Sequence, residues 1–518
     1  MKIREKIAAV LAKIVAWVYG ILFLIILYLV IFKVSKINYA YKCIYPWDNW
    51  KYLVLGVVLW ILLRWTQKYY PLTIRRFVKK HSGKLLVGAT VLLFVIQLFA
   101  VYNYYFETGW DSYVLVNTSQ TLADGYEFDI ESEQSYYYST YPNNFLMVFV
   151  FTNIIRIGNI IGIGPIMAIL IVQCMISAVT GFLVFRIIYL WRGLLREAWN
   201  VWLLYVLILG FSPWVSIPYS DAMGLIFPAL ILYLYVSATK GKYFCVKVFL
   251  LAAVSVFAYK IKPQLLILFI ALLIILILKL IKGKIAEKKA VIKGLGCGIG
   301  GFVFMMWAVS AATGSVGIPT DDEAVFSPAH YIMMGLNPVT NGGYLEEDVY
   351  FSHVQPKEKR VEADLQVARE RIEEYGASGM AEHLLKKMLI NYSDGTWAWG
   401  AEGGFYSKVF EDKNQWISPF LKSIYYYDGS RYGFFLSYSQ TMWMLLLAGC
   451  FLTFLFRGKK IEGVVLVMML SVVGLSLFEM IFEARARYLY CYVPIYILLA
   501  YTGLENLWGK LQRRKRNV

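Results

Sequence analysis

Residues that could act in catalysis occur in four short clusters, and each cluster stands beside an apolar run of the sequence. Glu107 and Asp111 lie in FETGWDSY, and the aromatic stretch YYYSTYPNNF follows at 136–145. The third cluster joins PYSDA with YKIKPQ, and the fourth is EARARY at 483–488. A carboxylate can take a proton from a hydroxyl group, whereas Lys and Arg neutralise phosphate. Together these groups suit a reaction between a phosphate-bearing substrate and a hydroxyl.

The elements that must position these clusters are strongly apolar. The 518 residues are 59% hydrophobic and only 16% charged, whereas soluble domains average about 45–50% apolar and about 25% charged. The excess sits in separate runs of about 17–25 residues, the length that crosses a bilayer as a helix. The sequence therefore predicts an all-α polytopic membrane protein. Its net charge of +17 comes from Lys and Arg clusters beside the apolar runs, which indicates membrane orientation and not nucleic-acid binding.

The basic clusters predict which loops face the cytoplasm. MKIREK and the basic loop at 64–84 are assigned to the cytoplasm, so the acidic loop after residue 105 faces outside. About twelve crossings result, with both termini cytoplasmic. The predicted crossings are 8–32, 50–65, 85–105, one within 145–190, 199–214, 222–239, 244–259, 265–281, 294–313, 434–456, 463–482 and 488–505. Whether 145–157 is a half-span or an interfacial helix stays open.

This topology divides the chain into four expected parts. They are residues 1–84 with two N-terminal helices and a basic loop, a transmembrane core at 85–313 with a first outside loop at 106–144, an extracytoplasmic domain of mixed structure at 314–433, and C-terminal helices with a basic tail at 434–518. One amphipathic helix is expected across 357–390, because apolar residues recur there at helical spacing. These residues are Val361, Leu365, Ala368, Ile372 and Tyr375.

Four short motifs of this sequence are similar to motifs of a known family. They are GWDSY, STYPNNF, KPQ and the RY that precedes the last apolar run. From about residue 85 onward the chain resembles the GT-C superfamily of membrane glycosyltransferases, and most of all bacterial relatives of the protein-mannosyltransferase group. The resemblance implies an inverting transfer of a sugar from a polyprenyl-phosphate carrier to an extracytoplasmic acceptor. That acceptor is a cell-envelope glycopolymer, a glycolipid or a protein. The expected location is a bacterial plasma membrane with the active site on its outer face.

Roles follow from the resemblance position by position. Asp111 is the expected catalytic base. Relatives often have a paired acidic motif where this chain has Asp111 followed by Ser112, so Glu107 or Asp124 is considered as a second acid. The carrier phosphate is expected to meet Lys262, Arg485 and Arg487. The substrate pocket is expected to include Tyr141, Pro142, Asn143, Asp221 and His330.

Plainer explanations exist for several of these residues. Asp111 and Asp221 could cap helices, and Lys262 could extend its amine toward the membrane surface. No metal site or cofactor is predicted, although the acidic runs at 321–323 and 346–348 leave a divalent cation open.

Two other functions remain from the residues alone. One is a polysaccharide ligase or polymerase, and the other is a transporter or flippase for lipid-linked sugars. Transporters often show inverted repeats, which this sequence does not show. The glycosyltransferase interpretation is therefore preferred.

Overall fold

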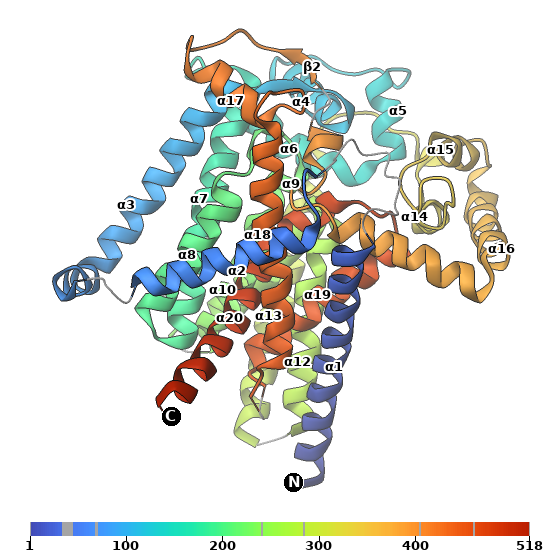
Figure 1. Ribbon diagram of the computed structural model, residues 1–518. Helices are drawn as coiled ribbons and strands as arrows, with labels where there is room; N and C mark the ends of the chain where they lie inside the picture. Colours follow the sequence, from blue (N-terminus) through green and yellow to red (C-terminus); the bar gives the residue numbers. More distant parts are fainter. Residues whose placement is uncertain are drawn as a thin grey trace.

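The computed structural model describes residues 2–33, 45–67, 71–239, 242–282, 285–403, 406–458 and 461–516. Within these residues, nine helical segments are long and apolar enough to cross a membrane. The helices gather in one bundle, and the chain begins and ends at the same end of it (Figure 1). The opposite end carries most of the short helices and is called the loop end below. The predicted all-α polytopic class is confirmed.

The nine apolar segments belong to the long helices of the bundle. They are α1 (Lys2–Phe32), α3 (Leu72–Tyr104), α7 (Pro165–Arg192), α9 (Ser220–Gly224) with α10 (Ile226–Ala238), α11 (Phe244–Ile261), α12 (Ile267–Lys282), α13 (Ile285–Gly314), α18 (Tyr432–Leu455) and α19 (Gly463–Ile481).

Helices also occupy the other three predicted crossings, but they are shorter or more polar. These helices are α2 (Asn49–Thr66), α8 (Leu195–Tyr205) and α20 (Val493–Arg516). Lys51 and Arg64 make α2 more polar, α8 has 11 residues before a π-helical turn, and α20 ends in KLQRRKR. Nine of the twelve expected crossings therefore lie in described helices that are long and apolar enough to cross a membrane, and the other three lie in α2, α8 and α20.

The stretch 145–190 makes the single crossing that was expected. Its first part is α6 (Phe145–Ile160), a helix of 16 residues that packs against α4 and α7. Only α7 qualifies as a span. Pro165 occupies the start of α7, where its missing N–H costs no helical hydrogen bond.

The loop end is built mainly from short helices. It contains β1 (Phe106–Thr108), α4 (Trp110–Ala123), α5 (Glu133–Thr140), α14 (Pro328–Gly335), α15 (Glu346–His353), α16 (Lys357–Tyr392), β2 (Tyr406–Val409) and α17 (Ile417–Tyr425). The strands β1 and β2 pair antiparallel and join the segment after α3 to the segment before α17. Between α13 and α18, the described residues are therefore helical apart from β2 and the connecting turns.

The helix predicted across 357–390 is confirmed as α16, with a kink at Gly376 where φ is 56°. The predicted apolar stripe is only partly its buried face, because Ala368 is buried but Val361 and Ile372 are exposed, while the polar Arg360 and Asp364 are buried. Arg360 donates to the carbonyls of Ser352, Glu323 and Val325. Hydrogen bonding to neighbouring turns, and not apolar contact alone, sets how this helix is rotated.

Close packing of α18 against α20 depends on glycine. A Cβ added to Gly449 would lie 2.8 Å from both Cβ and the carbonyl oxygen of Ala500, and one added to Gly503 would meet the carbonyl oxygen of Gly449. Small residues allow helix backbones to approach closely inside membranes. The two glycines therefore bring the helix that follows the EARARY segment against the core.

We expect Gly503→Ala to lower the melting temperature of the purified protein, because the added methyl group has no space between α18 and α20. Overpacking of this kind typically costs about 1–3 kcal/mol. Gly509→Ala in the same helix is the matched control, since nothing lies within 4 Å of its added Cβ. Equal melting temperatures for the two variants would contradict the packing argument.

Candidate functional site

Asp111 lies in the first turn of α4, at the loop end of the bundle. The preceding residue, Trp110, has a φ of 53°, which turns the chain sharply out of β1 into the helix. The Tyr219 hydroxyl donates a hydrogen bond of 3.0 Å to Oδ2 of Asp111. Among the described residues Asp111 makes no ion pair, and its side chain is half-buried. It is therefore a carboxylate held by a neutral donor.

Arg487 lies next to this carboxylate in a cage of aromatic rings. Its guanidinium carbon is 4.8 Å from the centre of the Trp110 ring and 5.2 Å from that of Tyr219. Tyr219 thus contacts Arg487 with its ring and Asp111 with its hydroxyl. Nε of Arg487 lies 2.7 Å from Oε2 of Glu402, and Nη1 lies 3.9 Å from Oδ2 of Asp221.

The other two predicted phosphate ligands also have carboxylate partners. Nη1 of Arg485 lies 3.1 Å from Oε2 of Glu402, and Arg485 is also paired with Glu483. Lys262 is paired with Asp221 and lies over the ring of Tyr488, 4.6 Å from its centre. Three cations thus meet three carboxylates, which are Asp221, Glu402 and Glu483. We call these six residues the ion cluster.

The ion cluster is buried, and this explains why its charges are matched one to one. Glu402, Asp221 and Arg487 are each less than one tenth exposed. An unpaired charge at such a site would cost several kcal/mol. Burial raises the pKa of Glu483, but Arg485 and the Tyr488 hydroxyl outweigh it, so the net pKa lies below its usual value. Glu483 is therefore ionised at neutral pH.

Four tyrosines lie within electrostatic range of Asp111, and we call them the tyrosine ring. Burial raises the pKa values of Tyr137, Tyr141, Tyr331 and Tyr344, and in each of them the negative charge of Asp111 raises the pKa further. Their hydroxyls are therefore neutral and close to the carboxylate. Of the predicted pocket residues, Tyr141 belongs to this ring.

Other predicted pocket residues lie at its edge or point elsewhere. Pro142 and Asn143 are exposed. The neighbouring Asn144 is the buried residue, and its amide donates to the Tyr137 hydroxyl at 2.9 Å. Asp221 does not cap a helix through its side chain, because it is paired with Lys262 in the first turn of α9.

The two considered second acids are not beside Asp111. Asp124 follows the other end of α4, and at 1.5 Å per residue it lies roughly 20 Å away along the helix axis. Glu107 belongs to β1, opposite Lys408 of β2, and lines a cavity on the other side of α4. Neither Glu107 nor Asp124 therefore forms a pair of acids with Asp111.

His330 is buried between α14 and α15 and not against Asp111. Its Nδ1 lies 2.7 Å from Oγ of Ser352, and its ring stacks on Phe326 with centres 4.1 Å apart. Burial lowers its pKa to about 4. The next residue, Tyr331, is the one that approaches Asp111.

One acid in each of the two runs considered for a cation has a cationic partner within the protein. Asp348 is paired with Arg371 at 2.6 Å, and Glu323 with Lys357 at 3.3 Å. Within the part of the chain that the structure describes, no three His, Cys, Asp or Glu side chains converge as a metal site would require.

Sequence reasoning missed Glu402, Tyr219 and Trp110. Glu402 lies in a π-helical turn, Trp399–Gly403, whose two preceding residues, Trp397 and Ala398, have positive φ angles. The single acid in the glycine- and tryptophan-rich stretch WAWGAEGG was its one available signal. Its pairing with both arginines depends on tertiary structure, which no spacing along the chain reveals.

The fold and the site define a polytopic α-helical membrane protein with a buried ion cluster at one end. Its family agrees with this class: residues 7–508 match the family described as "Conserved hypothetical integral membrane protein", and the chain belongs to that family. No curated protein matches the chain.

We expect His330 to make stability fall in acid. Between pH 6.5 and about 4 the unfolded chain binds a proton at this residue that the folded chain does not bind, so the free energy of unfolding decreases as the pH falls. His330→Gln should weaken the drop in melting temperature between pH 7 and pH 5, measured on the purified protein. His81→Gln in α3 is the control and should keep the wild-type drop. The same drop in all three proteins would contradict the assignment.

Proposed function

We propose that this protein is an integral-membrane glycosyltransferase that moves a sugar from a polyprenyl-phosphate carrier to an acceptor hydroxyl. The observation that carries the proposal is the position of Asp111. It is a carboxylate without a cationic partner among the described residues. The side chain of Tyr219 contacts both this carboxylate and Arg487 of the ion cluster. The sequence resemblance to GT-C enzymes supports the same reaction.

In the proposed reaction, Asp111 accepts the proton of the acceptor hydroxyl. The acceptor oxygen then forms a bond to the anomeric carbon, while the bond from that carbon to the carrier phosphate oxygen breaks. The electron pair leaves with the polyprenyl phosphate, and the configuration of the sugar inverts. Hydrogen bonds from Arg485, Arg487 and Lys262 stabilise the charge on the leaving phosphate.

The ion cluster sets a condition on this step. Its three positive charges are already balanced by Asp221, Glu402 and Glu483. A phosphate must therefore share the arginines with these carboxylates or displace one of them. The tyrosines around Asp111 supply neutral hydroxyls and ring faces, both of which suit a sugar.

Orientation and location belong to the same proposal. The Lys and Arg distribution supports an orientation with the loop end outside a bacterial plasma membrane and residues 106–144 and 314–433 extracytoplasmic. The acceptor is then a component of the cell envelope.

We expect Asp111→Asn to reduce sugar transfer by at least about a hundredfold, because general-base catalysis typically contributes about 10²–10⁴. The assay is transfer from radiolabelled polyprenyl-phospho-sugars, with mannose, glucose, galactose and N-acetylglucosamine in turn, by purified protein with a cell-envelope acceptor. Wild-type activity in a folded Asp111→Asn variant would exclude this base. Absence of transfer by wild-type protein from every donor would favour the transporter or ligase function instead.

Arg487→Ala should raise the KM for the carrier lipid far more than Arg75→Ala. Arg487 is buried in the ion cluster, whereas Arg75 is exposed at the start of α3. The measurement is initial rate against carrier concentration for both variants, with melting temperature as the check on folding. Equal effects of the two changes would show that Arg487 serves orientation or folding only.

A further inference from the structure

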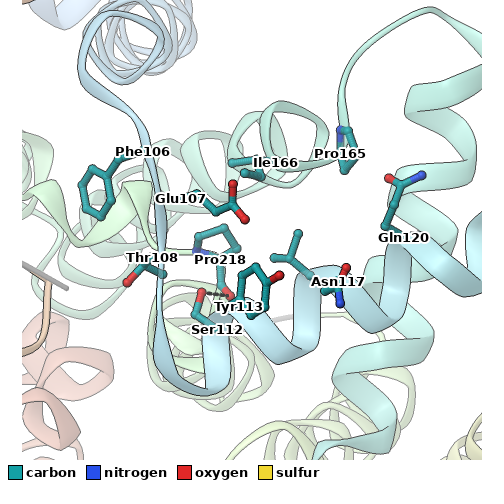
Figure 2. A pocket seen from close by; sticks show the side chains of 11 residues that line it. Phe106, Glu107, Thr108, Ser112, Tyr113, Asn117, Gln120, Pro165, Ile166 and Pro218 are labelled. Atoms are coloured by element: carbon teal, nitrogen blue, oxygen red, sulfur yellow. Dashed lines mark hydrogen bonds between the residues drawn. The ribbon is translucent and has the colours of Figure 1, made fainter. Parts of the chain in front are cut away.

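A cavity of about 190 Å³ lies on the face of α4 that points away from Asp111. Five residues of α4 at helical spacing line it, and it is closed by β1, the start of α7 and Pro218 (Figure 2). The Ser112 hydroxyl donates to the carbonyl of Pro218 at 2.9 Å and forms part of the wall. Because Tyr219 binds Asp111 on the other side, this wall separates the cavity from the ion cluster.

The cavity contains polar groups that the protein itself does not use. Among the described residues, the side chains of Glu107, Tyr113 and Asn117 make no hydrogen bond or ion pair within the protein. Oε1 of Gln120 is buried and also without a partner. Tyr113 and Asn117 are exposed and Glu107 is half-buried, so water reaches them, whereas a buried oxygen such as Oε1 of Gln120 normally has a partner, which a bound ligand can supply.

The chemistry of the lining selects among ligands. The described lining has one carboxylate and neither Lys nor Arg, which disfavours a phosphate. The carboxylate and amide oxygens accept hydrogen bonds, so the ligand must donate them. Tyr113, Ile166 and Pro218 add apolar faces on which the C–H face of a sugar ring can rest. The volume is below the roughly 300–1,000 Å³ of drug-sized sites and suits a single ring.

Directly beside this cavity, an apolar groove runs between α3 and α7. It has a volume of about 350 Å³, and its lining includes Leu98, Phe99, Met167 and Ile171. Ile166 lines the polar cavity and the next residue of α7, Met167, lines the groove, so the two spaces lie at the same level of this helix. Both helices that form the groove are candidate membrane spans.

We infer that the groove and the cavity together bind a neutral glycolipid, with a hydrocarbon chain between α3 and α7 and one uncharged sugar ring beside Glu107 and Asn117. The absence of a cation in the described lining distinguishes this lipid from a polyprenyl-phosphate carrier. This glycolipid is a second lipid ligand and not the acceptor, because α4 keeps it out of reach of Asp111. Its site and Asp111 lie on opposite faces of α4, about one helix diameter apart, or about 10–12 Å.

The test measures lipid binding by the full-length protein in phosphatidylcholine nanodiscs. Competing probes are monoglucosyl diacylglycerol, diacylglycerol, phosphatidylglycerol and phosphatidylethanolamine. Wild-type protein should bind the glucosyl lipid about tenfold more tightly than the other three. The double variant Glu107→Gln, Asn117→Leu should bind the glucosyl lipid and diacylglycerol equally. Glu131→Gln, an exposed acid outside the cavity, is the control and should keep the tenfold preference.

A second variant tests the groove separately from the cavity. Ile171→Trp should weaken binding of the glucosyl lipid and of diacylglycerol alike, because it fills the space for the chain. Tightest binding of phosphatidylglycerol or phosphatidylethanolamine, or a glucosyl preference that survives the double variant, would overturn the inference. Melting temperatures of all variants show whether each is folded, and Ile171→Trp provides an independent result if the double variant is not.

The transfer assay separates this inference from the proposed function. Asp111→Asn should keep the tenfold glucosyl preference while losing transfer, since Asp111 does not line the cavity. A glucosyl preference without transfer from any donor would remove the proposed function and leave the glycolipid site.

Discussion

The pairing of Glu402 with Arg485 and Arg487 is the interaction on which the rest of the loop end depends. Two arginines cannot be buried together without anions, since removing one partner of a buried ion pair typically costs about 3–5 kcal/mol. Glu402 comes from a turn far along the chain, and Trp110 holds that turn by donating to the Glu402 carbonyl at 3.2 Å. Trp110, the residue next to Asp111, is therefore fixed by the backbone of the same residue whose carboxylate pairs with the arginines.

A second set of contacts fixes the segment that carries these arginines. The Lys387 amine of α16 donates to the carbonyls of Gly335, Met480 and Phe482 at 2.6–2.9 Å. Burial lowers the pKa of Lys387 to about 7, although Glu479 and Glu483 oppose the shift. The end of α19, and with it Glu483 and Arg485, is thus held by a helix of the loop end. Loop segment and membrane core determine the site jointly.

The sequence predicts the membrane spans well, because apolarity over a fixed length alone determines them. It predicts the site less well. Runs of apolar residues suffice for α1, α3 and α19, because bilayer thickness sets their length. Orientation by charge brings Asp111, Lys262 and Arg487 to one end, and the structure confirms that these three lie close together. The rotation of α16 and the partner Glu402 depend on contacts between distant segments. Asp124 shows that closeness in sequence is also a poor guide to the site, since it lies at the opposite end of α4 from Asp111.

The helix α4 separates two environments with opposite preferences for charge. On the Asp111 side, the proposed phosphate adds negative charge to a cluster that is already balanced, so it must share the arginines with the carboxylates or displace one of them. On the Glu107 side, one carboxylate and two amides without a cation exclude phosphate and accept hydroxyl donors. In the proposed arrangement the carrier lipid and the neutral glycolipid bind on opposite faces of α4. A charged head group is unfavourable on the Glu107 side, and this keeps the two lipids at separate sites. The short helix, through Ser112 on Pro218 and Tyr219 on Asp111, is what keeps those two surfaces a fixed distance apart.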